Sequence, residues 1–149
     1  MLKRIENRIS LYYDDDAEAR RQACIASARA AQAAARARIN AAQAKIDEAK
    51  ENISNYKNKK SDIKTQKQSA NELKSQYNEA QSRANAHNLN VNVTSCTGCL
   101  DSLISEFDGM IGECDTKIQE WTEKRVAAAQ EKAEAEMDYQ NAVNAEAGC

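Results

Sequence analysis

The chain has 149 residues, of which 5% are aromatic and 30% are charged, with a formal net charge of −2. This small share of large apolar side chains cannot fill a thick globular core, and an elongated fold is therefore expected. The 21 basic and 23 acidic side chains form no long block of one sign, which argues against nucleic acid as the main partner, because phosphate binding needs a concentrated basic surface.

The composition favours helix throughout the chain. Proline is absent, glycine occurs four times, and alanine, glutamine, glutamate, lysine and arginine dominate. These residues have the highest helix propensities. The sequence therefore predicts an all-α fold in a single domain over residues 1–149, an elongated antiparallel helical hairpin or coiled coil.

A short leading helix is expected over residues 1–13, because apolar residues there follow a helical spacing in a register of their own: Leu2, Ile5, Ile9 and Tyr12. Asp15 and Glu18 have the spacing of a capping box and predict the start of a long helix over residues 14–86. The amino terminus lacks the apolar segment of a signal peptide, and no apolar run approaches the roughly 20 residues that span a bilayer. The protein is therefore expected to start in the cytoplasm and to have no membrane span.

A seven-residue repeat dominates the long helix. One seam position carries Ile25, Ile39, Ile46 and Ile53, and the other carries Ala28, Ala35, Ala42, Ala49, Tyr56, Ile63, Ala70, Tyr77 and Ala84. Beyond Tyr56 the first position becomes polar at Lys60, Lys67 and Lys74, while Leu73 and Ala80 become apolar on the adjoining flank. Such a sideways shift of the seam is typical of a fairly straight helix.

The connection is expected over residues 87–98, where asparagine alternates with Leu89, Val91 and Val93. A second helix is expected over residues 99–147, and Gly109 and Gly112 are positioned to kink or interrupt it. Its apolar stripe, together with two isoleucines of the first helix, predicts the core: Ile53, Ile63, Leu100, Leu103, Phe107, Ile111, Ile118 and Trp121.

These lengths leave part of the first helix uncovered. At 1.5 Å per residue it would extend about 110 Å and the second helix about 70 Å. The alanine-rich segment over residues 23–44 is therefore predicted to overhang and to pack on another chain. The predicted partner-binding residues are Ala28, Ala35, Ile39, Ala42 and Ile46. The alternative is a fold-back within residues 52–58 that makes a three-helix bundle, but no glycine or proline marks a turn there.

The cysteines offer the only candidates for chemistry. Cys96 and Cys99 form a Cys-x-x-Cys motif where the loop becomes a helix, although the βαβ context of redox motifs is absent. A zinc site would use His87, Cys96, Cys99 and Cys114, but only if the helix folded back at the glycines. Cys24 is expected in the core, and Cys149 is a terminal thiol without a prenylation motif. With a single histidine and no phosphate-binding loop, neither an enzyme nor a cofactor is expected.

A long helix, a polar connection and an apolar helix with Leu100, Leu103 and Phe107 resemble the small helical-hairpin proteins of the Trp-x-Gly class from bacterial type VII secretion loci. The likeness covers residues 39–137 and is to the longer YwqH-like members encoded beside LXG-type toxins. Gly98 matches the glycine of the motif, whereas Cys96 stands in place of its tryptophan. The Tyr-x-x-x-Asp spacing from Tyr12 to Asp16 is similar to the export signal of such systems but lies at the opposite end of the chain.

The resemblance implies a non-enzymatic adaptor or targeting chaperone that packs on the amino-terminal helical domain of a secreted effector, and that leaves the cytoplasm with it. Two other readings stay open. One is a homodimeric coiled coil in which two copies cover each other's alanine-rich segments. The other is a thiol redox or zinc module at Cys96 and Cys99.

Overall fold

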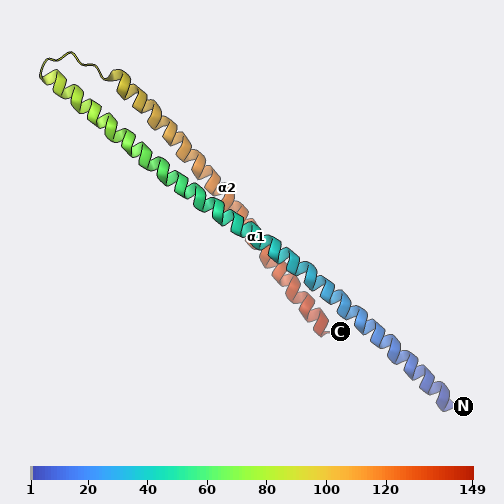
Figure 1. Cartoon of the computed structure of the whole chain (residues 1–149). Helices are drawn as coiled ribbons and strands as arrows, with labels where there is room; N and C mark the ends of the chain where they lie inside the picture. The colour runs from blue at the N-terminus through green and yellow to red at the C-terminus, as the bar shows by residue number, and fades with distance from the viewer. Residues whose placement is uncertain (1) are drawn as a thin grey trace. The chain divides into compact units, whose positions relative to one another are not determined.

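The computed structural model describes the backbone of residues 2–149 and the side chains of residues 15–149. Helix α1 spans Leu2–Ala86 and helix α2 spans Thr94–Ala147, and the chain from residue 2 onward contains no strand. The two helices are antiparallel and pack on each other as a hairpin (Figure 1). The prediction of an all-α helical hairpin is confirmed.

Helix α1 continues without a break through Tyr13, so the separate leading helix over residues 1–13 is not present. Asp15 and Glu18 lie inside α1 and do not begin it. A carboxylate oxygen of Glu18 lies 3.7 Å from an Nη of Arg21, and Asp16 makes a similar pair with Arg20 at 3.5 Å. Glu18 therefore pairs along the helix surface instead of capping a terminus. The apolar pattern predicted from Leu2 to Tyr12 involves side chains that lie outside the described residues.

The chain divides into two compact units. Unit 1 combines α1 up to Ile46 with the segment Val126–Cys149, and unit 2 is the segment Asp47–Arg125, which contains the connection between the helices.

Unit 1 packs through two rows of alanine that repeat every seven residues. All six side chains are at most 7% exposed: Ala28, Ala35 and Ala42 on α1, and Ala128, Ala135 and Ala142 on α2. Methyl side chains bury little area, so burial alone stabilises this unit weakly. Their small size instead lets the two backbones approach closely. Ion pairs flank the seam, with Lys45 Nζ 3.1 Å from a Glu131 carboxylate oxygen and Arg38 Nη1 2.5 Å from an Asp138 carboxylate oxygen.

The residues predicted to bind a partner lie inside this intramolecular seam. Ala28, Ala35, Ala42 and Ile46 are buried and Ile39 is half-buried, all within the unit that α2 completes. The overhang predicted at residues 23–44 is therefore wrong, because the chain covers this segment itself. The fold-back at residues 52–58 is also absent, since α1 is helical throughout.

The connection explains why α2 reaches so far back along α1. Helix α2 begins at Thr94 rather than at residue 99, and the connection folds against the last turns of α1. Gln81 Nε2 donates a hydrogen bond to the Val91 carbonyl at 2.6 Å, and the Val93 amide donates one to Gln81 Oε1 at 3.1 Å. The loop thus consumes little of the length that α2 needs to cover α1.

Helix α1 ends in a motif that a left-handed asparagine completes. Asn88 has a φ of 54°, a conformation that asparagine tolerates better than most residues. The Leu89 amide donates to the Ala84 carbonyl at 2.8 Å, and the Asn88 amide donates to the Asn85 carbonyl at 3.2 Å. This pairing is a Schellman motif, which satisfies carbonyls that the end of the helix leaves free.

Unit 2 contains the larger apolar side chains. Ile53, Ile63, Leu100 and Cys114 are buried in it. The remaining predicted core residues are half-buried, with one exception: Phe107, Ile111, Ile118 and Trp121 are half-buried and Leu103 is 38% exposed. The predicted interruption at Gly109 and Gly112 is absent, because α2 continues through both residues.

A ladder of three ion pairs follows the register of unit 2. In each pair a lysine Nζ of α1 lies 2.5 Å from an aspartate Oδ1 of α2: Lys60 with Asp115, Lys67 with Asp108 and Lys74 with Asp101. Successive pairs advance seven residues along α1 and go back seven along α2, as an antiparallel coiled coil requires. The lysines stay half-buried in the seam because each ammonium has a carboxylate partner.

No described stretch of helix combines the length and the apolarity that crossing a bilayer requires.

Candidate functional site: an open apolar groove in unit 2

The two flanks of the unit 2 helix pair differ in chemistry. On α2 the ladder aspartates each follow a seam residue by one position, whereas Leu103 and Met110 each precede a residue of the other seam row. At 100° per residue these positions lie on opposite sides of the seam. One flank is therefore charged and internally paired, and the other carries apolar side chains.

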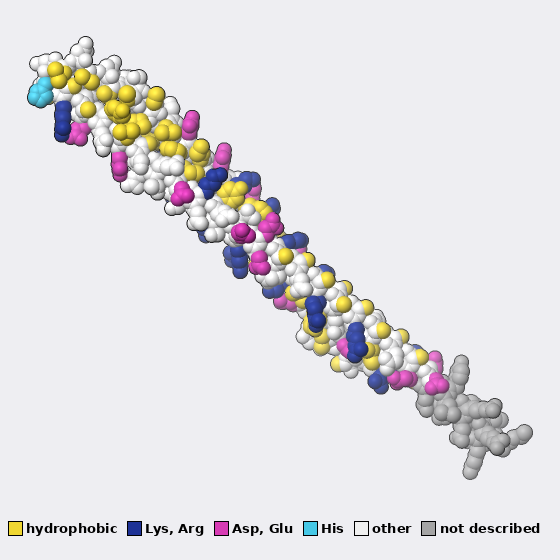
Figure 2. All heavy atoms as spheres, viewed as in Figure 1, with side chains coloured by type: hydrophobic (Ala, Val, Ile, Leu, Met, Phe, Trp, Pro, Cys, Tyr) yellow, Lys and Arg dark blue, Asp and Glu magenta, His cyan; other side chains and the backbone are white. Residues whose placement is uncertain are grey.

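Three large side chains are exposed on this apolar flank. Leu73 of α1 is 43% exposed, and Leu103 and Met110 of α2 are 38% and 46% exposed. Figure 2 shows hydrophobic side chains gathered on the visible face of unit 2, near its histidine. The prediction that Leu103 belongs to the core is wrong, because its position places it beside the seam.

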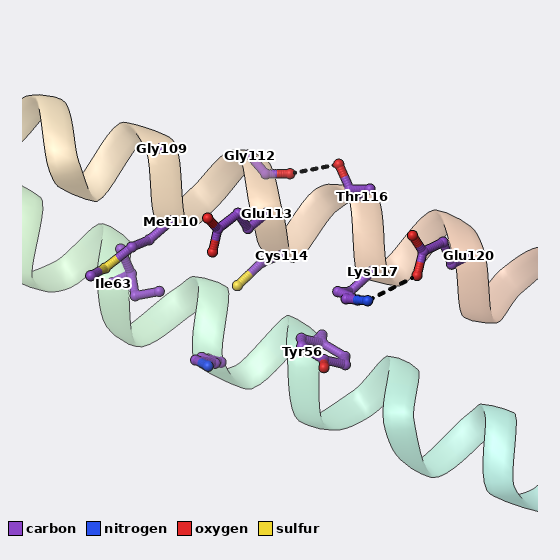
Figure 3. Close-up of a pocket in the computed structure, with 11 residues that line it drawn as sticks. Tyr56, Ile63, Gly109, Met110, Gly112, Glu113, Cys114, Thr116, Lys117 and Glu120 are labelled. Carbon is purple, nitrogen blue, oxygen red and sulfur yellow. Dashed lines mark hydrogen bonds and ion pairs between the residues drawn. The ribbon is translucent and has the colours of Figure 1, made fainter.

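A groove of about 870 Å³ opens on the same flank. Figure 3 shows Met110 and Cys114 of α2 pointing toward Ile63 and Tyr56 of α1, which together form its apolar floor and walls. A second hollow of about 520 Å³ lies at the connection end of unit 2, lined by Gln76, Glu79, Ala80, Arg83, Ala84, His87 and Leu89. The apolar flank thus contains two concave sites.

Two glycines leave backbone open on the α2 wall of the groove. No atom lies within 4 Å of the position that a Cβ would take at Gly109 or Gly112. Glycine lowers helix stability by roughly 1 kcal/mol relative to alanine, and packing within the described chain does not require it at either position. Both glycines line the groove.

Charged side chains border the apolar floor. Glu113, Lys117 and Glu120 stand on the α2 wall and Lys59 on the α1 wall. Lys117 Nζ lies 3.2 Å from Glu120 Oε2, so these two charges are paired within α2. Apolar contact area with a few charged groups at the rim is the usual anatomy of a protein interface.

The residues proposed as zinc ligands are not brought together in the described part of the chain. Cys96 and Cys99 are free thiols in the first turns of α2, and Cys114 is buried in the groove floor. On one unbroken helix, Cys99 and Cys114 stand about 22 Å apart. His87 lies in the connection, and among the described residues no three His, Cys, Asp or Glu side chains come together as metal ligands.

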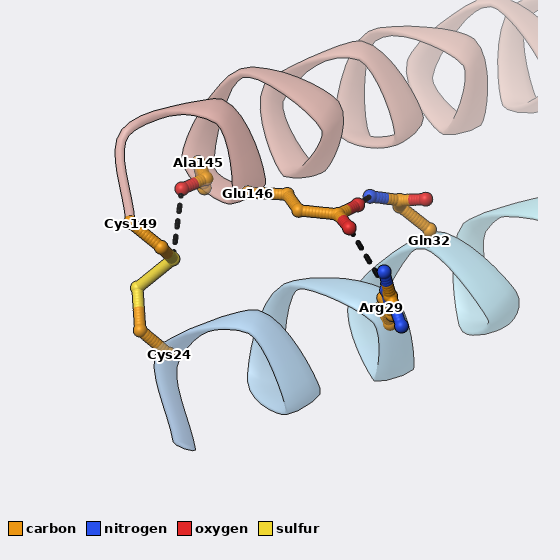
Figure 4. Close-up of a disulfide and its surroundings, with 6 residues drawn as sticks. All are labelled: Cys24, Arg29, Gln32, Ala145, Glu146 and Cys149. Atoms are coloured by element: carbon orange, nitrogen blue, oxygen red, sulfur yellow. Dashed lines mark hydrogen bonds and ion pairs between the residues drawn. A yellow bond between two sulfur atoms is a disulfide. The ribbon is translucent and has the colours of Figure 1, made fainter. Parts of the chain in front are cut away.

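Cys24 and Cys149 form a disulfide that closes unit 1, with their Cα atoms 5.9 Å apart (Figure 4). The prediction that Cys24 lies in the core is wrong, because Cys24 is exposed, and the terminal thiol of Cys149 is bonded to it. Two cysteines 125 residues apart carry no sequence motif. They meet because the antiparallel register of α1 and α2 in unit 1 brings the end of the chain to Cys24.

Next to the disulfide, Glu146 links α2 to α1. Arg29 Nε donates a hydrogen bond to Glu146 Oε1 at 2.8 Å, and Gln32 Nε2 donates one to Oε2 at 2.6 Å. These two hydrogen bonds, chiefly that from Arg29, hold the pKa of the Glu146 carboxyl below its ordinary value of 4.5.

The chain matches no known family model, no curated protein and no solved structure. The sequence indicates the apolar flank of α1 through Leu73 and Ala80, but it gave no prediction for Met110, although Met110 lies seven residues after Leu103.

Proposed function

We propose that this chain is a non-enzymatic helical adaptor that packs on a helical region of a partner protein through the groove of unit 2. The observation that carries the proposal is the exposure of Leu73, Leu103 and Met110 on one flank of unit 2, where Met110 lines a groove with an apolar floor. Apolar side chains that stay exposed together, rimmed by polar residues, are typical of interaction sites.

This proposal moves the docking surface away from the alanine-rich seam. Ala28, Ala35 and Ala42 are covered by α2 of the same chain and have little surface left to offer. The alternative of a homodimer required an uncovered alanine seam. Because α2 covers that seam, this argument for a homodimer no longer applies. The proposed partner-binding site is therefore the unit 2 groove.

The resemblance to Trp-x-Gly proteins supports a more specific role, that of a targeting chaperone for the amino-terminal helical domain of a type VII secreted effector. The disulfide between Cys24 and Cys149 supports export with that partner, since disulfides persist in oxidising compartments and are rare in the cytosol.

The test is complex formation with the products of neighbouring genes. The tagged chain is co-expressed with each neighbour, and complexes are sized by chromatography with light scattering. Met110→Glu places a charge in the groove and is expected to abolish the complex. Met137→Glu is the matched control, because Met137 is 67% exposed in unit 1 and does not line the groove. A complex that survives Met110→Glu contradicts the proposed surface.

A further inference from the structure

The α2 wall of the groove carries a row of acidic side chains. Glu106, Glu113 and Glu120 repeat every seven residues, so they share one face of the helix, and Glu113 and Glu120 line the groove. Glu120 is paired with Lys117. Glu106 and Glu113 are exposed and make no ion pair or side-chain hydrogen bond with any described residue.

We propose that the groove binds an amphipathic helix of a different protein, whose lysine or arginine residues repeat every seven positions on the flank that faces α2. This inference rests on the proposed adaptor function and names the chemistry of its partner. The apolar stripe of the docked helix packs on Tyr56, Ile63 and Met110. Its basic side chains reach Glu106 and Glu113, which stand about 10.5 Å apart along the axis of α2.

The row of glutamates on α2 argues for a different protein rather than a second copy of this chain. If α2 of a second copy lay antiparallel against this α2, the two rows of glutamates would face each other with like charges. A basic helix instead gains pairs on both glutamates, and the open backbone at Gly109 and Gly112 leaves room for its close approach.

The experiment titrates the full-length oxidised protein with designed helical peptides of about 21 residues, or three heptads. All peptides have leucine at the seam positions, and one flank carries lysine, glutamine or glutamate. The lysine peptide is expected to bind about tenfold more tightly than the glutamine peptide, since two exposed ion pairs together supply roughly that factor. The glutamate peptide should bind most weakly. Raising the salt concentration should reduce the differences in affinity among the three peptides.

Charge reversal in the protein provides the decisive comparison. The double variant Glu106→Lys/Glu113→Lys is expected to reverse the order of the peptide affinities and to bind the glutamate peptide most tightly. Both positions are exposed, so circular dichroism should show unchanged helicity. Glu134→Lys is the control, because Glu134 is an exposed acid of unit 1, and it should leave the order unchanged.

The outcomes separate this inference from the proposed function. If the three peptides bind with equal affinity and Met110→Glu abolishes their binding, the basic partner is wrong and the adaptor groove stands. If no peptide binds and the protein forms a dimer that Met110→Glu dissociates, the groove is a self-association surface and both proposals fall. If no peptide binds a monomeric protein, the basic-helix inference is wrong, and complex formation with the products of neighbouring genes decides separately whether the adaptor function stands.

Discussion

Glu146 shows how single side chains supplement a seam made of alanine. Its carboxylate accepts hydrogen bonds from Arg29 and Gln32 and thereby joins α2 to α1 next to the disulfide. Because the folded pKa lies below 4.5, the stabilising contribution of this group is fully present above pH 4.5. It is lost as the pH falls through the folded pKa.

Removing the arginine should raise this pKa. In Arg29→Met we expect the pKa of Glu146 to move up toward 4.5, because the strongest donor to the carboxylate is gone. The measurement is an NMR titration of the Glu146 side-chain carboxyl carbon. Arg20→Met is the control, since Arg20 pairs with Asp16 and should leave Glu146 unaffected. A wild-type pKa at or above 4.5 would contradict the observed contacts.

At the scale of the helices, the alanine seam depends on small side chains at particular positions. Ala35 is 2% exposed and Ala34 is exposed one position earlier on the same helix. Ala35→Leu is expected to lower the free energy of unfolding by about 1–3 kcal/mol, because three added carbons must fit between closely packed helices. Ala34→Leu should change it by less than about 0.5 kcal/mol. Urea unfolding followed by circular dichroism measures both, and equal effects would mean that this face of α1 is not covered by α2.

The helices were predictable to different degrees. The seven-residue repeat of isoleucine and alanine correctly predicted the seam of α1, because burial requires that period. The length that α2 covers was not predictable, since it depends on Gln81 holding the connection against α1 and on Thr94 starting α2 early. From the sequence alone, a sideways shift of the apolar seam is predicted at Lys60, Lys67 and Lys74. Their role became visible only with the aspartates of α2 opposite them.

The groove was only partly predictable, for a similar reason. Leu73 and Ala80 already marked an apolar flank in the sequence, but Leu103 was assigned to the core. Whether an apolar residue next to a seam is buried depends on what the facing helix presents, and a single sequence does not reveal that pairing. The same holds for the Cys24–Cys149 disulfide, which the register creates.

At the scale of the whole chain, the disulfide closes a loop of about 125 residues. Loop-closure entropy predicts that reduction lowers the free energy of unfolding by up to about 5 kcal/mol. Urea unfolding with and without a phosphine reductant measures the difference, and Cys149→Ser should reproduce the reduced protein. Cys96→Ser/Cys99→Ser is the control and should leave the oxidised midpoint unchanged, since both thiols are free. Identical midpoints for oxidised and reduced protein would show that the bond is not formed in solution.

If the chain covers its own alanine seam and binds a different protein at the unit 2 groove, the free protein should be a monomer. The mass of the free, oxidised protein in solution tests this most directly. Sedimentation equilibrium should give a single species at the chain mass of 16.5 kDa over a wide concentration range. A stable species of twice that mass, persisting on dilution, would contradict it.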